Sequence, residues 1–297
     1  MRRFRIRCCR NWMGADVGRA DLHIHTTASD GTLTPSEVVQ QAAARGLKAI
    51  AITDHDTIGG IAGALQAAVA NGLDVIPGVE LSAEKGLNEM HILGYYVDHY
   101  NDGLRHKLEI LRKARRERAW RMMEKLAGLG MRLHWERIVQ IAGEGSAFGR
   151  PHVAQALQEK GYVSSIDEAF DRYIGRRGPA YVSRYKITPL EAIKMITDAK
   201  GLPVLAHPRG QEHMLPELVE AGLVGLEVYY PGYPIDQSEA LVELAKRHTL
   251  IPTGGTDFHG RRGLGTMSVG QVWVPMQSVE RLHVLAMNQA DQDSTVL

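Results

Sequence analysis

From Arg19 onward, short apolar runs alternate with longer amphipathic stretches, a pattern typical of strands connected by helices. The first helix is bounded on both sides: Thr34 and Glu37 form a capping box around a proline, and Gly46 follows the last helical residue. Over the first hundred residues, strands are predicted at 20–24, 47–53 and 74–78, a further helix at 58–71 and a further apolar stretch at 90–97. Two strand–helix–strand units in series predict parallel strands covered by helices.

The alternation stops between residues 102 and 181. Apolar residues recur there at steps of three and four, from Leu104 to Leu129, which predicts a long amphipathic helix. Shorter helices are predicted at 135–142 and 151–160. A second capping box, Thr188 with Glu191, then begins a helix. Four more strands are predicted after it, at 202–206, 224–229, 250–253 and 269–274. The expected fold is an α/β barrel of about seven strands, formed by 19–101 and 182–290, with a helical insert at 102–181.

Composition limits the class of protein. The chain has 297 residues, of which 44% are hydrophobic and 23% charged, so it can bury one large core and a modest subdomain. A net charge of +1 gives no global reason to expect a nucleic-acid or membrane binder, and no apolar run approaches the roughly 18 residues of a membrane span. We expect residues 1–18, which include the adjacent Cys8 and Cys9, to form a flexible leader, and the protein to be cytoplasmic.

Imidazoles and carboxylates gather where the predicted strands begin or end. In α/β barrels the active site lies at the carboxyl ends of the strands. Nine candidate residues occupy such positions: His23, His25, Asp30, His55, Glu80, His91, His207, Asp257 and His259. Independent structural roles would not be expected to place all of them at one edge of a barrel.

These residue types point to metal coordination. His23 and His25 lie two apart on a strand and point to the same side, so both can bind one ion. Neutral imidazole with carboxylate suits manganese, zinc or iron. Nine groups are too many for one ion, and a carboxylate such as Glu80 can bridge two. Neighbouring cations lower the pKa of a water molecule bound between them and neutralise the charge that develops on phosphoryl oxygens. Both effects favour hydrolysis, so the residue types indicate a hydrolase.

Each motif alone also fits a structural role. The His23–His25 pair is a weak signal by itself, Asp54 to Asp56 could cap a helix, and Glu80 could be an exposed loop carboxylate. Only the shared position at strand ends favours a metal centre. Six further histidines fall elsewhere and are expected to be exposed or structural: His99, His106, His134, His213, His248 and His283.

Six ordered motifs resemble the PHP family, named for its polymerase and histidinol-phosphatase members. They are DLHIHTTASDGTLTP, ITDHDTIGG, GVELS, HILGY, LAHP and GTDFH, and they span Asp21 to about His259. The resemblance implies a distorted seven-stranded barrel with two or three divalent ions, manganese first and zinc or iron as alternatives. It implies three ligand sets: His23, His25, Glu80 and Asp257; Glu80, His91 and His207; and Asp30, His55 and His259. We assign catalytic roles to His207, Asp257 and His259.

The helical insert carries a local positive charge. Between residues 105 and 125, nine Lys or Arg against three Glu give +6, which fits either an anion-binding stripe or a solvated face with Glu–Arg pairs. The start of the predicted helix at Gly149 fits either an anion site or an ordinary cap. The insert resembles that of the nucleotide phosphoesterases within the family. That resemblance suggests six phosphate- or nucleotide-binding residues: Arg112, Arg115, Arg118, Arg150, His152 and Arg209. Tyr229, Tyr230 and Tyr233 could stack on a base or pack over the barrel rim.

We therefore expect a metal-dependent phosphoesterase that removes the 3′-phosphate of nucleoside 3′,5′-bisphosphates. A 5′→3′ exonuclease on short 5′-phosphorylated RNA, a histidinol-phosphate phosphatase and a metal-stabilised structural module stay open as alternatives. An amidohydrolase is also open, although phosphate-binding arginines have no obvious use with a neutral amide. The expected partners are a small phosphorylated nucleotide or a short RNA. Neither a membrane nor an obligate protein partner is expected.

Overall fold

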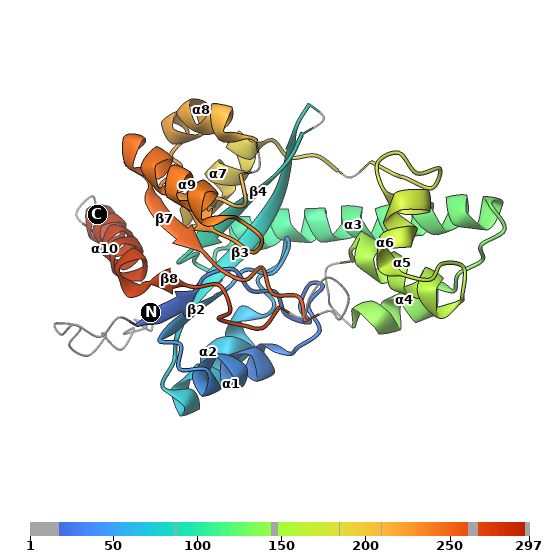
Figure 1. Cartoon of the computed structure of the whole chain (residues 1–297), viewed down its shortest axis with the longest axis horizontal. Coiled ribbons are helices and arrows are strands. Elements are labelled where there is room, and N and C mark those ends of the chain that lie inside the picture. Colours follow the sequence, from blue (N-terminus) through green and yellow to red (C-terminus); the bar gives the residue numbers. More distant parts are fainter. Residues whose placement is uncertain are drawn as a thin grey trace.

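An eight-stranded sheet forms the centre of the fold. Its strands are β1 (Arg19–Asp21), β2 (Ala49–Ile52), β3 (Asp74–Lys85), β4 (Asn88–Tyr95), β5 (Leu202–Leu205), β6 (Gly225–Tyr229), β7 (Ile251–Gly254) and β8 (Val274–Pro275). In the order β7-β6-β5-β4-β3-β2-β1-β8 they curve into a nearly closed barrel (Figure 1). This computed structural model describes residues 18–86, 88–143, 148–183, 185–208, 210–260 and 267–294. The predicted α/β barrel is confirmed.

Helices cover the barrel and form a block at one side of it. Around the barrel lie α1 (Pro35–Ala44), α2 (Ile61–Asn71), α7 (Pro189–Asp198), the 3₁₀ turn η2 (Glu212–Met214), α8 (Leu215–Glu220), α9 (Ile235–Arg247) and α10 (Met276–Ser294). The helical block contains α3 (Asp102–Gly128), α4 (Trp135–Ala142), α5 (Arg150–Glu159), α6 (Ile166–Ala169) and the π-helical turn η1 (Phe170–Ile174). Both predicted capping boxes, at Thr34 and Thr188, are confirmed. No helix in the described part of the chain is long and apolar enough to cross a membrane.

Strand direction follows the length of the connections. β1, β2 and β3 are parallel and linked by helices, as predicted. β5, β6 and β7 are also parallel and linked by helices. β4 is antiparallel to both β3 and β5. Parallel strands need a crossover of a dozen or more residues, whereas β3 and β4 are two residues apart. The predicted strand 74–78 therefore continues to Lys85 and turns back as a long hairpin.

One predicted strand is wrong. Of residues 269–274, Val274 belongs to a strand, β8, which pairs with β1. Ahead of it, Val269 is buried, and the Gly270 N–H donates to a carboxylate oxygen of Asp21 at 2.8 Å. Val274 is buried as well, whereas Trp273 is 39% exposed. A side chain rather than a neighbouring strand satisfies the Gly270 N–H.

The barrel closes beside the carboxyl ends of its first and last parallel strands. The Leu22 N–H donates to the Gly254 carbonyl at 3.1 Å, and the His25 N–H donates to the Phe258 carbonyl at 2.9 Å. These bonds join the chain that follows β1 to the chain that follows β7. Residues more than two hundred positions apart are thereby brought to the same edge.

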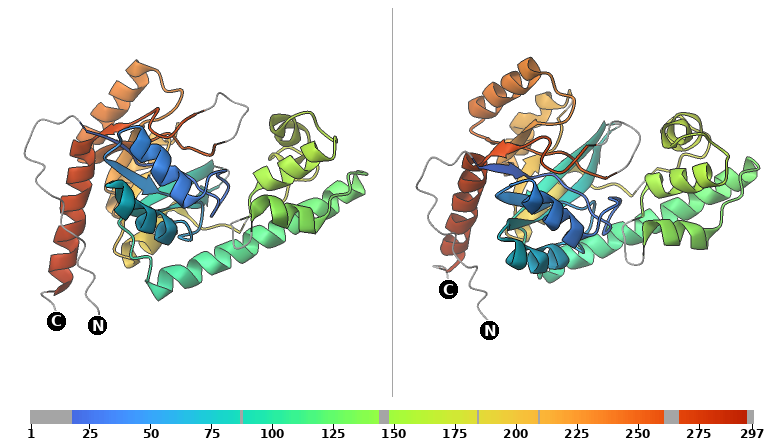
Figure 2. Two further views of the ribbon diagram at one scale, coloured as in Figure 1. Left: turned by 90° about the horizontal axis from the view of Figure 1, so that it is seen from below. Right: turned by 60° about the horizontal axis from the view of Figure 1, so that its bottom comes forward.

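The long helix α3 contributes to two cores. Leu104, Leu108 and Leu111 belong to a buried cluster of the barrel. Farther along the same helix, Ala119 and Leu126 belong to the buried cluster of the helical block. Figure 2 shows α3 running along the barrel and on into the block. One continuous helix thus connects the two parts.

A prediction concerns the contact that closes the barrel. A Cβ at Gly255 would lie 2.4 Å from the His23 nitrogen and 2.6 Å from Asp21 Oδ1, whereas Gly128, at the end of α3, has open space around it. We expect Gly255→Ala to lower the free energy of unfolding by about 1–3 kcal/mol through overpacking. Gly128→Ala should leave it unchanged or raise it by up to about 1 kcal/mol. Urea unfolding measures both, and equal effects would contradict the packing argument.

Candidate metal centre

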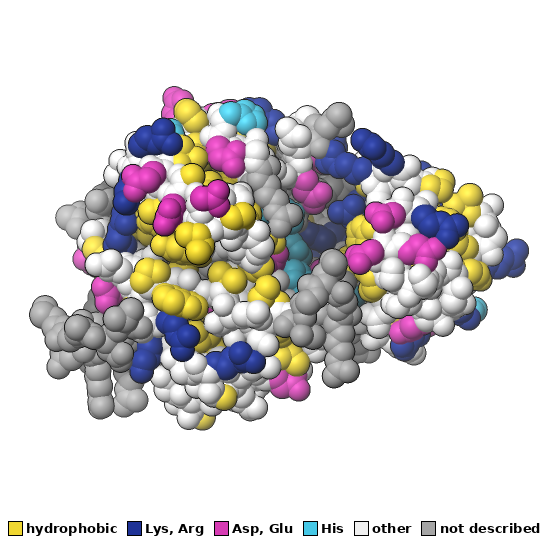
Figure 3. Space-filling model, in the orientation of Figure 1, with side chains coloured by type: hydrophobic (Ala, Val, Ile, Leu, Met, Phe, Trp, Pro, Cys, Tyr) yellow, Lys and Arg dark blue, Asp and Glu magenta, His cyan; other side chains and the backbone are white. Residues whose placement is uncertain are grey.

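The nine predicted ligands converge at the edge where the barrel closes. His23 and His25 follow β1, and Asp257 and His259 follow β7, so the backbone bonds between these segments bring the four side chains together. Histidine side chains are visible in the hollow between the barrel and the helical block, with lysine and arginine side chains beside them (Figure 3). The centre therefore faces the helical block.

The carboxylate of Glu80 is the middle of the cluster. It lies on β3, and its side chain is 1% exposed. Imidazole nitrogens surround its two oxygens at distances of 2.7–3.4 Å: those of His23, His25, His55, His91 and His207. Oε2 faces the first three histidines and Oε1 the last two. This arrangement gives Glu80 the geometry of a bridging ligand.

Three groups of ligand atoms, each within 4.8 Å of one another, could hold a metal ion: His23, His25, Glu80 and Asp257; His25, Asp30, His55 and His259; and His55, Glu80 and His91. Among the described residues, His23 Nε2, His55 Nδ1 and Glu80 Oε2 are buried without a hydrogen-bond partner, as are both ring nitrogens of His25. Buried polar atoms of this kind call for a further partner. Their donor types, imidazole and carboxylate, fit divalent cations.

The electrostatics of the protein chain also favour a cation. Burial alone would lower the pKa of His25, but contacts with Asp257 and Glu80 raise it to about 10. Burial likewise opposes protonation of His91, yet Glu80 raises the pKa of His91 to about 9. The pKa of Glu80 is held well below its usual range, against the effect of burial, by His55, His91 and His23. The carboxylates thus stabilise positive charge at this place, and protons and metal ions compete for it.

Residues behind the ligands fix their orientation. His23 Nδ1 lies 3.0 Å from Glu227 Oε1, which leaves Nε2 facing Glu80 and Asp257. The other carboxylate oxygen of Glu227 accepts the His207 N–H at 2.8 Å. His259 is held in the same manner, with Nδ1 2.8 Å from the Asp257 carbonyl and Nε2 facing Asp30. Such outer partners set the tautomer and direction of a ligating histidine.

Glu227 is not among the site residues that the sequence pattern predicts. It is fully buried in β6, within a segment whose pattern predicts an apolar strand. A glutamate in such a strand is itself a signal, because a buried carboxylate needs a partner. The sequence does not reveal that this partner is His23, a metal-ligand candidate 204 positions earlier in the chain.

Two further buried carboxylates hold the loops that carry ligands. Asp21 accepts both the N–H and the hydroxyl of Thr256, at 2.9 and 2.6 Å, and burial raises its pKa to about 6 despite these bonds. Asp54 accepts the Thr26 N–H at 2.7 Å and the Ser29 hydroxyl at 2.6 Å. Side-chain hydrogen bonds therefore tie the loops around His25 and Asp257.

Two of the predicted phosphate-binding arginines lie close to the cluster. Arg115, on α3, donates to Asp56 Oδ2 at 2.6 Å and to the Ser82 hydroxyl at 3.0 Å. Arg150, at the start of α5, has its guanidinium 3.7 Å from the Glu89 carboxylate. Another Glu89 oxygen lies 3.4 Å from His91 Nε2.

Other predicted binding residues make different contacts. Arg112 lies 3.3 Å from Glu109 on the exposed face of α3, and Arg118 donates to the Val182 carbonyl at 2.8 Å. His152 is buried, and its Nδ1 accepts the Gly149 N–H at 3.1 Å, which caps α5. Arg209 lies outside the described residues. Their roles towards substrate stay predictions.

Tyr230 contacts the cluster directly. Its hydroxyl donates to Asp257 Oδ2 at 2.6 Å, and its ring packs edge-on against His207. Of the three tyrosines at the end of β6 and just after it, Tyr230 therefore contacts a carboxylate of the candidate metal ligands.

The role of Glu227 gives a prediction. In Glu227→Gln, an NH2 group replaces one carboxylate oxygen. Because this group donates hydrogen bonds and cannot accept them, the contact with either His23 or the His207 N–H is lost. We expect metal affinity to fall about 10- to 100-fold, as measured by titration calorimetry. Glu243→Gln, on the exposed face of α9, is the control. Unchanged affinity in a folded Glu227→Gln protein would remove Glu227 from this role.

Comparison with known proteins places the chain in a family. The PHP domain family model matches residues 21–177. A 3′,5′-nucleoside bisphosphate phosphatase of Chromobacterium violaceum is 34% identical over 262 residues, which cover 86% of this chain and 91% of the relative. A phosphoribosyl 1,2-cyclic phosphate 1,2-diphosphodiesterase of Eggerthella lenta is 31% identical, covering 82% and 95%. The 5′-3′ exoribonuclease Rnm of Escherichia coli is 33% identical, covering 88% and 96%.

Two solved structures have a similar fold over most of the chain. A candidate metal-dependent phosphoesterase of Bifidobacterium adolescentis superposes with a TM-score of 0.82 at 32% identity, covering 89% of this chain and 94% of the other. A Chromobacterium violaceum protein described as an amidohydrolase, with bound sulfate, has a TM-score of 0.80 at 31% identity, covering 89% and 96%. The predicted class, a metal-dependent phosphoesterase, is confirmed. The chain belongs to the PHP domain family, as its six ordered motifs predicted.

Proposed function

We propose that this protein hydrolyses the 3′-phosphate of nucleoside 3′,5′-bisphosphates. The observation that carries the proposal is the contact chain from the ligand cluster to an arginine of the helical block: Glu80, His91, Glu89 and Arg150 follow one another at 2.7, 3.4 and 3.7 Å. A phosphate at the metal centre and a second phosphate at Arg150 match a substrate with two phosphates on one ribose. The bisphosphatase of Chromobacterium violaceum supports the same substrate.

The protein side chains would act in two ways. The three ligand groups hold two or three divalent ions, for which we propose manganese, with zinc or iron as alternatives. When bound, such ions generate a nucleophile from water at neutral pH and neutralise phosphoryl charge. Asp257 and His259 serve as ligands, and His207 assists proton transfer to the leaving oxygen. Arg150 holds the second phosphate through charge-assisted hydrogen bonds.

The same arrangement supports a second candidate function, 5′→3′ exonuclease action on short 5′-phosphorylated RNA. The Escherichia coli relative favours it. In both functions the segments 19–101 and 182–290 carry the metal centre and 102–181 binds phosphate. We further propose a cytoplasmic location for both.

The first test is substrate choice with and without metal. Protein loaded with manganese is offered adenosine 3′,5′-bisphosphate, histidinol phosphate and a 5′-phosphorylated trinucleotide, and kcat/KM is compared. We expect the bisphosphate to be the best substrate and activity to disappear after removal of metal with a chelator. Full activity of metal-free protein would refute the metal mechanism. Turnover of a neutral amide with no turnover of any phosphoester would refute the phosphoesterase assignment.

The second test concerns the proposed clamp. Arg150→Ala removes a charge-assisted contact worth about 1.5–3 kcal/mol, so kcat/KM for the bisphosphate should fall roughly 10- to 100-fold. Arg121→Ala is the matched control, because Arg121 pairs with Glu117 on the exposed face of α3. An unchanged kcat/KM in Arg150→Ala would exclude Arg150 from the site.

A further inference from the structure

Arg150, to which the proposed function gives the second phosphate, has contacts on two sides. It is the first residue of α5, and 23% of its side chain is exposed. On the barrel side, the guanidinium lies 3.7 Å from the Glu89 carboxylate of β4. On the side of the helical block, it lies over the ring of Phe170, 5.3 Å from the ring centroid. An aromatic face attracts a cation within about 6 Å of its centroid.

Neither contact occupies the hydrogen-bond donors of Arg150. A distance of 3.7 Å to Glu89 is too long for a hydrogen bond, and the aromatic ring attracts the positive charge as a whole. A guanidinium carries five N–H donors, and phosphate oxygens accept such donors in charge-assisted pairs. The two neighbours therefore hold the guanidinium and leave it able to bind an anion.

The ring of Phe170 is itself held by the helical block. Phe170 begins the π-helical turn η1, directly after α6. Its side chain packs against the buried cluster of the block, and η1 contacts α5, the helix that carries Arg150. The packing of the block therefore determines where the ring lies.

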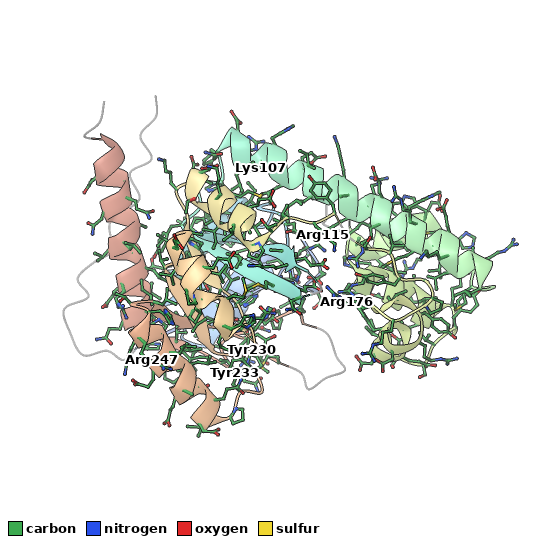
Figure 4. The ribbon with its side chains drawn as sticks, turned by 90° about the horizontal axis from the view of Figure 1, so that it is seen from above. Lys107, Arg115, Arg176, Tyr230, Tyr233 and Arg247 are labelled. Carbon is green, nitrogen blue, oxygen red and sulfur yellow. The ribbon has the colours of Figure 1, made fainter. Side chains whose placement is uncertain are left out.

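The shape of η1 depends on a glycine. The Gly175 N–H donates to the Phe170 carbonyl, five residues earlier, at 2.8 Å. A Cβ at Gly175 would lie 2.3 Å from the same carbonyl oxygen, so a larger residue would displace the turn. Wide turns of this kind are frequent at functional sites. The next residue, Arg176, lies between the barrel and the helical block (Figure 4), so η1 ends on the side of the block that faces the barrel.

An arginine that is held in advance binds phosphate better. A free arginine side chain loses much rotamer freedom when it binds a ligand, and this loss is smaller when the side chain is already in place. Glu89 also attracts the guanidinium, but as an anion it repels a phosphate. The neutral ring of Phe170 attracts the same charge without that repulsion.

We propose that Phe170 is a positioning residue, whose ring holds Arg150 where it binds the second phosphate of the substrate. The inference rests on the proposed function and adds to it a residue that acts through Arg150 rather than on the substrate. It gives the turn η1 a role in substrate affinity.

Binding to the metal-free protein tests this role apart from chemistry, in a double-mutant cycle with Arg150. Isothermal titration with adenosine 3′,5′-bisphosphate gives Kd. We expect Phe170→Leu to raise Kd about 3- to 10-fold, as the loss of a cation–π contact predicts. In the Arg150→Ala protein, where the ring has no guanidinium to hold, the same change should alter Kd less than twofold. An equal rise in both backgrounds would mean that Phe170 acts only through the packing of the block, and would overturn the inference.

Kinetics of the manganese-loaded protein gives a second measure. Arg150 is assigned to the phosphate that is not transferred, so Phe170→Leu should raise KM about 3- to 10-fold and leave kcat within twofold. Phe170→Tyr, which keeps the ring, should stay within twofold of the wild type in both quantities. An unchanged KM in folded Phe170→Leu protein would overturn the inference.

Tyr173→Leu is the matched control. Tyr173 belongs to the same turn, packs against the same buried cluster and has the Arg172 guanidinium 5.1 Å from its ring centroid. Arg172, however, is 59% exposed and pairs with Glu168. The control should therefore leave Kd and KM within twofold, and changes equal to those of Phe170→Leu would overturn the inference. If Phe170→Leu does not fold, Phe170→Met, which fills more of the volume of the ring, replaces it with the same expected results.

The two proposals fail separately. If the wild-type protein hydrolyses the bisphosphate and Arg150→Ala lowers kcat/KM, but Phe170→Leu changes neither Kd nor KM, the role of Phe170 is refuted and the proposed function stands. If the wild-type protein hydrolyses no phosphoester but the binding cycle couples Phe170 to Arg150, the proposed function is refuted and the positioning of Arg150 by Phe170 stands. A protein that neither binds nor hydrolyses the bisphosphate refutes both.

Discussion

A single buried carboxylate organises this protein. The Glu80 side chain is almost entirely withdrawn from solvent, and an ionised carboxylate in such a place is costly unless positive groups surround it. The fold supplies them from several strand ends and loops, which is possible only if the strands close into a barrel. The charge of Glu80 is therefore compensated only when the barrel is closed, because closure brings the histidines of distant segments to it.

The residues that hold the candidate metal ligands in place are themselves buried carboxylates. Glu227 joins His23 to the backbone of His207, while Asp21 and Asp54 tie the ligand-bearing loops. Two of the residues they help to hold, His207 and Asp257, have positive φ values of 24° and 47°. Non-glycine residues rarely adopt this conformation, and it persists only where the surroundings impose it. The rigidity of the centre thus comes from outer hydrogen bonds as much as from the ligands.

Local signals in the sequence are sufficient to predict much of the fold. The capping boxes at Thr34 and Thr188 depend on residues three apart. The clustering of most ligand candidates follows from their positions after strand ends, although Glu80 and His91 lie within β3 and β4. Signals that depend on distant partners are not visible in the same way. The +6 charge of residues 105–125 does not reveal that Arg112 pairs with Glu109 along the helix while Arg115 reaches Asp56 of the barrel. Glu227 escapes prediction for the same reason, since its partners are remote in sequence.

The helix α3 limits how far the helical block can move relative to the barrel. It runs for 27 residues, and both buried clusters include its side chains. A continuous helix bends sharply only where its hydrogen-bond ladder is interrupted. A swinging motion of the helical block would therefore break the helix or unpack its side chains from one of the two buried clusters. The separation between the barrel and the helical block is therefore set when the chain folds.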